Sequence, residues 1–181
     1  MSRKYRNHYE IRNEETAKGL KKTVIYVGDH YRFSAGDKQR KVLAGKTFIA
    51  GSVNIALFAA AGMMNGEFSR NIFILLPYVI QFLPAVMLVI AAISLFKIKG
   101  DLTVPQFKTV FVRIKTMSVL NVFLEGVIVS EAIIVTLISR SFPGTHDILF
   151  TVFTAAMSGG YIGIIILHTR IGKDVNILGT A

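Results

Sequence analysis

Four long runs of apolar residues constrain the fold of this chain more than any other feature of its sequence. Each run has about the 20 residues that a helix needs to cross a hydrocarbon layer roughly 30 Å thick. Backbone polar groups find no water inside a bilayer, so each run is expected to form a helix whose hydrogen bonds stay within the segment. We therefore predict an all-α fold, a polytopic integral membrane four-helix bundle. The membrane domain covers residues 42–169, with spans at about 42–64, 72–96, 117–139 and 148–169.

The composition agrees with this interpretation and excludes several classes of function. Hydrophobic residues make up 52% of the 181 residues, and they are concentrated in the four runs rather than scattered as in a soluble domain. The formal net charge is +10, and most of the charged residues lie outside the runs. There they indicate orientation in a membrane rather than binding to nucleic acid. The chain has no cysteine, which excludes disulfides, thiolate catalysis and cysteine-ligated metal sites.

Lysine and arginine residues flank the predicted spans unequally. Residues 1–41 contain eleven of them, the connection at 97–116 contains five, and the tail at 170–181 contains two. The two opposite connections contain only Arg70 and Arg140. The positive-inside rule then predicts a multi-pass protein of the cell membrane with both termini in the cytoplasm. Its basic inner side would contact anionic lipid of the inner leaflet.

Two of the cytoplasmic segments have patterns of their own. Residues 23–34 alternate around Gly28-Asp29, which favours a small β-hairpin with a type II′ turn over a plain loop. In the connection at 97–116, Thr103 and Gln106 have the spacing of a capping box, which predicts the start of an amphipathic helix. That helix is either interfacial or a cytoplasmic extension of the third span.

Two carboxylates, Glu125 and Glu131, lie inside the third predicted span. A charged group at mid-span costs about 2.5–3.5 kcal/mol on insertion scales, so we expect at least one of the two to be protonated. Six residues separate them, which places them roughly 120° apart around the helix and about 9 Å apart along it. They are therefore not expected to form one paired site. Ser118 and Asn121 precede Glu125 at helical spacing and would form a polar stripe with it.

Polar residues in the other spans are candidate partners for these acids. Counting from the outer end of the second span places Gln81 about 13 Å deep, which predicts a depth close to that of Glu131. The other candidates lie near the middle of their spans. The candidate partners are Asn54 in the first span, Gln81 in the second, and Ser158 and Tyr161 in the fourth.

Two interpretations of the buried polar residues stay open. In the first, Glu125, Asn121 and Asn54 form a proton or cation relay. In the second, the same residues make interhelical hydrogen bonds worth about 0.6 kcal/mol each. For Glu131 we favour the second interpretation, because this residue is nearer the water of the outer leaflet.

Small residues recur at every fourth position in two spans, a spacing that lets helix backbones approach closely. Such stripes pack either inside the bundle or against a second protein. They are Ser52, Ala56 and Ala60 in the first span and Ala155, Gly159 and Gly163 in the fourth.

Two prolines, Pro77 and Pro84, lie nearly on one face of the second span. We expect them mainly to bend this span, which neighbouring helices then brace. The alternative is that the carbonyls they free bind an ion.

No motif in the sequence names a reaction or a ligand. We find no Ser-His-Asp grouping, no histidine pair with metal-ligand spacing and no phosphate-binding loop, so we predict no catalytic residues, metal or other cofactor. The leading hypothesis is a non-enzymatic interaction or accessory subunit that packs with a membrane-protein partner or forms a homo-oligomer. The alternative is a small oligomeric transporter or channel that is coupled to protons or cations through Glu125.

Overall fold

The computed structural model describes residues 9–16, 19–33, 36–98, 100–139, 142–172 and 175–178. Several residues that entered the charge argument lie outside these ranges: those in residues 1–8, Lys18, Lys99, Arg140 and Lys173. So do parts of the predicted hairpin and of the tail.

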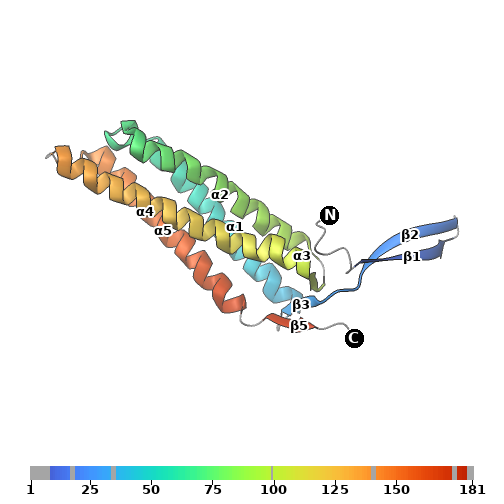
Figure 1. The fold of residues 1–181 in the computed structure, drawn as a ribbon. Helices are drawn as coiled ribbons and strands as arrows, with labels where there is room; N and C mark the ends of the chain where they lie inside the picture. The colour runs from blue at the N-terminus through green and yellow to red at the C-terminus, as the bar shows by residue number, and fades with distance from the viewer. Residues whose placement is uncertain are drawn as a thin grey trace.

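Four long helical segments run side by side and form a bundle (Figure 1). Each is long and apolar enough to cross a membrane, which confirms the predicted all-α fold and identifies a multi-pass membrane protein. The bundle is a ring in which the first segment packs on the second and fourth, and the third also packs on the second and fourth. The segments are α1 (Gly36–Gly62), α2 (Ile72–Lys97), the continuous run of α3 (Val104–Phe107), η3 (Lys108–Val112) and α4 (Arg113–Ser139), and α5 (Thr145–Gly172).

The third segment begins well before the apolar run that predicts it. The Thr103 hydroxyl accepts from the Gln106 N–H at 3.4 Å, and the Gln106 side chain accepts from the Thr103 N–H at 3.0 Å. This is the predicted capping box, with Pro105 in the first turn, where its missing N–H costs little. The amphipathic connection is thus an extension of the third span, joined to α4 through the π-helical turn η3.

A short 3₁₀ helix, η2 (Phe68–Arg70), leads from α1 towards α2. The buried side chain of Asp147, in the first turn of α5, accepts from the Phe68 N–H at 2.9 Å and from the Gly144 N–H at 3.3 Å. Asn71 caps α2 by accepting from the Phe73 N–H at 2.9 Å. The two bonds of Asp147 join the two connections at this end of the bundle, which we call the loop end.

Two small sheets lie at the opposite end of the bundle. Strands β1 (Tyr9–Thr16) and β2 (Gly19–Tyr26) form an antiparallel hairpin that projects away from the helices (Figure 1). Strand β3 (His30–Phe33) pairs on one side with β4 (Leu102–Thr103) and on the other with β5 (Val175–Leu178). We call this end, where the N-terminal region, the α2–α3 connection and the tail meet, the sheet end.

The predicted hairpin over residues 23–34 is wrong in its pairing. Residues 23–26 belong to β2, which pairs upstream with β1, while β3 pairs with strands from later in the chain. Alternation in the sequence marked two strands but not their partners. A strand pairs with whichever strand the fold places beside it. The strands beside β3 come from distant segments of the chain.

Apolar side chains fill most of the bundle interior, and the outward faces are apolar as lipid requires. A close approach of α1 to α2 depends on Gly51, because a Cβ atom there would lie 2.9 Å from the side chains of Leu88 and Val89. Polar residues interrupt this interior at a few levels, and these form the candidate site.

Candidate functional site

A group of polar side chains from all four helices lies inside the bundle around Glu125. Glu125 on α4 is 0% exposed. The amide of Gln81 on α2 faces its carboxyl group. Asn54 on α1 and Tyr161 on α5 lie beside each other, and Tyr161 is within electrostatic range of Glu125. We call Glu125, Gln81, Asn54, Tyr161 and Asn121 the interior polar site.

The Glu125 and Gln81 side chains face each other without reaching hydrogen-bond geometry. Both carboxyl oxygens of Glu125 and both polar atoms of the Gln81 amide lack a hydrogen-bond partner within the described part of the chain. An unsatisfied buried polar group costs about 1–3 kcal/mol, and a charged one costs more. Such groups in a native structure are commonly completed by an added proton, a water molecule or a bound ion.

The predicted polar stripe of α4 lies on the buried face of that helix. Ser118 and Asn121 are fully buried, like Glu125 one turn further on. The Ser118 hydroxyl donates to the Ile114 carbonyl at 2.9 Å, and the Asn121 amide nitrogen donates to the Met117 carbonyl at 3.0 Å. Each of these bonds uses one donor within α4, whereas the Asn121 side-chain oxygen has no partner among the described residues.

Asn54 reaches across to α5 because residue 160 is a glycine. Its amide nitrogen donates to the Met157 carbonyl at 3.4 Å. A Cβ atom at position 160 would lie 2.3 Å from the Asn54 side-chain oxygen. The small-residue stripe predicted from the sequence contains Gly159 and Gly163 but not Gly160. The signal that could have identified Gly160 was Asn54, which lies at a similar depth on the neighbouring helix and whose side chain needs room on α5.

The predicted depth of Gln81 is wrong. Counting residues from the end of α2 placed it beside Glu131, but it faces Glu125. Glu131 is half-buried and lines a groove of about 450 Å³ at the loop end, together with Phe73 and Ile134. The two acids thus occupy separate environments, as their angular separation predicts.

A second buried polar contact lies nearer the sheet end. The Thr47 hydroxyl donates to the Leu43 carbonyl at 2.8 Å, so it accepts from Nε2 of His168 at 2.9 Å. The ring of Phe111, in η3, lies 4.9 Å from the His168 ring. Stacked contacts continue from Phe111 to Phe107 at 4.8 Å and from Phe107 to Tyr31 of β3 at 4.2 Å. These rings link the small sheet to the helix interior through the π-helical turn.

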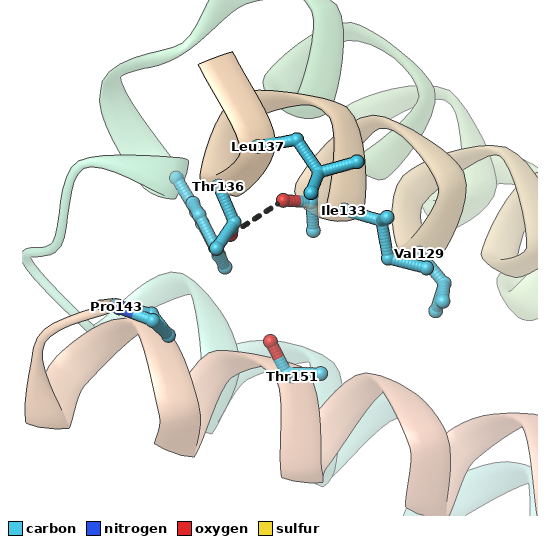
Figure 2. A pocket seen from close by; sticks show the side chains of 8 residues that line it. Val129, Ile133, Thr136, Leu137, Pro143 and Thr151 are labelled. Atoms are coloured by element: carbon cyan, nitrogen blue, oxygen red, sulfur yellow. Dashed lines mark hydrogen bonds between the residues drawn. The ribbon is translucent and has the colours of Figure 1, made fainter. Parts of the chain in front are cut away.

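A pocket of about 250 Å³ between α4 and α5 at the loop end is apolar (Figure 2). Its two threonine hydroxyls are already committed within their own helices. Thr136 donates to the Ala132 carbonyl at 2.8 Å, and Thr151 donates to the Asp147 carbonyl at 2.9 Å. The pocket therefore offers hydrocarbon contacts but little polar recognition.

The small-residue stripe of α5 faces outwards. Ala155, Gly159 and Gly163 are exposed, and a Cβ atom added at either glycine would meet nothing within 4 Å. On α1, Ala56 is exposed while Ser52 and Ala60 are half-buried. The α5 stripe therefore does not pack inside the bundle, and its packing against a second protein stays a prediction.

No family model, curated protein or solved structure matches this chain. The function is therefore argued from the geometry of the interior polar site and of the outward faces.

Proposed function

We propose that the chain is a small transporter or channel for protons or monovalent cations in which Glu125 is the ion-binding group. The observation that carries this proposal is the complete burial of Glu125 at mid-span, faced by polar residues of the other helices. An ionisable residue that faces the interior of a membrane bundle commonly marks an ion or proton pathway.

Neither basic side chain of the four predicted spans neutralises Glu125. In the described part of the spans, Lys46 is exposed on α1, and His168 bonds Thr47 towards the sheet end. The carboxyl group must therefore carry a proton or attract a mobile cation to be stable at this depth.

The two helices that carry the facing pair are both irregular. On α2, Pro77 and Pro84 are buried on either side of Gln81, and each removes a backbone hydrogen bond of the helix. On the third segment, the π-helical turn η3 precedes α4 and Glu125. Prolines and π-turns are the usual places where helices bend. Bending at these points would change the separation of Gln81 and Glu125 and so admit or release an ion.

Flux through reconstituted vesicles tests this function. Wild-type protein should carry protons or Na⁺ down an imposed gradient, and Glu125→Gln should abolish the flux while keeping the side-chain shape. Glu131→Gln is the matched control, since it removes the other acid of the same helix and should leave the flux intact. Equal flux in the wild type and Glu125→Gln, or none in the wild type, would contradict the proposal.

A second candidate is the non-enzymatic interaction or accessory role. The outward α5 stripe favours it, because small residues on a lipid-facing helix let another helix approach closely. Gly159→Leu should then remove a co-purifying membrane partner or dissociate an oligomer. Gly126→Leu is the control, because Gly126 is also exposed with nothing within 4 Å but lies on α4, away from the α5 stripe. An assembly that survives Gly159→Leu would exclude this face as the interface.

A further inference from the structure

We infer that Glu125, Gln81 and Asn121 form a binding site for one small monovalent cation of the sodium type. This inference rests on the proposed function and narrows its substrate.

The charge of the site matches a single positive charge. Glu125 is the one carboxylate among the residues of the interior polar site, and among the described residues the hydroxyls of Tyr78 and Tyr161 lie within its electrostatic range. An ionised Glu125 with a monovalent cation is neutral overall. A divalent cation would leave a net positive charge in a medium of low dielectric, which is strongly unfavourable.

The unpartnered acceptors of the site are oxygens, which are the ligands that hard cations prefer. They are the two carboxyl oxygens of Glu125, the amide oxygen of Gln81 and the amide oxygen of Asn121, all buried. The Asn121 amide nitrogen donates to the Met117 carbonyl, and its oxygen, which has no partner among the described residues, is an available acceptor. The described residues contain no cluster of three or more His, Cys, Asp or Glu side chains that would suit a transition metal.

Complete burial of the site inside the helix bundle favours a small ion. Glu125, Gln81 and Asn121 are each at most 1% exposed, and the rings of Tyr78 and Tyr161 are buried nearby. The larger K⁺ ion needs longer ligand distances and would have to push the helices apart.

A proton competes with the cation for the same carboxyl group. A protonated Glu125 can donate its O–H to the Gln81 amide oxygen while the Gln81 N–H donates to the remaining carboxyl oxygen. This acid–amide pair satisfies both side chains without a metal ion. Cation binding therefore requires release of the proton and should strengthen as the pH rises.

Thermal unfolding of the purified full chain in phosphatidylcholine nanodiscs tests the inference. Circular dichroism would follow unfolding at pH 8.5 in NaCl, KCl or choline chloride of equal ionic strength. Na⁺ should raise the unfolding temperature in a saturable manner, K⁺ less and choline not at all, because a ligand that binds only the folded state stabilises it. Titration at pH 5.5 should show at least ten-fold weaker Na⁺ binding.

Variants assign the effect to the site. Glu125→Gln should abolish the Na⁺ dependence and Glu131→Gln should preserve it. Gln81→Met keeps the side-chain length but removes one oxygen ligand, so it should weaken Na⁺ binding at least ten-fold. Equilibrium binding of ²²Na⁺ measures the same affinities independently of unfolding, in case one variant folds poorly. Equal unfolding of the wild type in NaCl and choline chloride, or a Na⁺ effect unchanged in Glu125→Gln, overturns the inference. Glu125-dependent proton flux could persist in either case, so the proposed function fails only in the vesicle assay.

Discussion

At the scale of single residues, two adjacent glycines of α5 have opposite surroundings and should respond oppositely to the same change. A Cβ atom at Gly160 would lie 2.3 Å from the Asn54 side chain, whereas one at Gly159 would meet nothing within 4 Å. Gly160→Ala should therefore lower the free energy of unfolding by about 1–3 kcal/mol, the usual cost of overpacking. Gly159→Ala should be neutral or stabilising by up to about 1 kcal/mol, because alanine is the better helix former. Denaturant unfolding in micelles measures both, and equal effects would contradict the contact between Asn54 and α5.

The sequence predicted the face of Glu125 more reliably than its partner. Helical spacing alone places Ser118, Asn121 and Glu125 on one side of α4, where the structure buries them. The partner depends on how far α2 is shifted along α4, and no single helix encodes that shift. Glu125 and Glu131 differ by only about 9 Å along the helix axis. An axial error of that size is enough to assign Gln81 to the wrong acid.

At the scale of elements, the Arg32–Asp101 ion pair joins β3 to the α2–α3 connection. Nε and Nη2 of Arg32 donate to the two Asp101 oxygens at 2.9 and 2.6 Å, and these bonds hold the pKa of Asp101 below its ordinary value. The stabilisation is therefore complete above the ordinary aspartate pKa and is lost as the pH falls through the lowered pKa. Amide exchange of β3, corrected for intrinsic rates, should accelerate in that acid range. Asp101→Asn should already exchange faster at neutral pH and lose most of the pH dependence; an unchanged profile would show that the pair does not hold the sheet.

The helices were predictable from the sequence because each one is a local pattern, whereas the sheet was not. Apolar runs mark the spans, and Thr103 with Gln106 marks the start of the third segment. The partners of β3 lie far along the chain in β4 and β5, so alternation around Gly28-Asp29 suggested a local hairpin instead. The π-helical turn η3 also has no signature in composition, since its residues suit an ordinary α-helix.

At the scale of the whole molecule, the small sheet joins segments that lie at one end of the bundle. Strands β3, β4 and β5 come from the N-terminal region, the α2–α3 connection and the tail, so these three lie at one end of the bundle (Figure 1). The same segments contain most of the lysine and arginine residues of the chain. Charge counting and strand pairing are independent, and both group these segments together. The positive-inside rule then predicts that the sheet end faces the cytoplasm and contacts anionic lipid.

Single-cysteine labelling tests this orientation cleanly, because the chain has no cysteine of its own. Lys38→Cys reports on the sheet end and Glu67→Cys on the loop end, and both native side chains are exposed. A membrane-impermeant maleimide added to intact cells should label the cysteine at position 67 at once and the one at position 38 only after permeabilisation. The reverse pattern would place the basic end outside and contradict the charge argument. Labelling of both positions in intact cells would be incompatible with four complete crossings, since α1 alone separates the two sites. Such a result would also mean that Glu125 lacks the low-dielectric surroundings on which its binding of an ion depends.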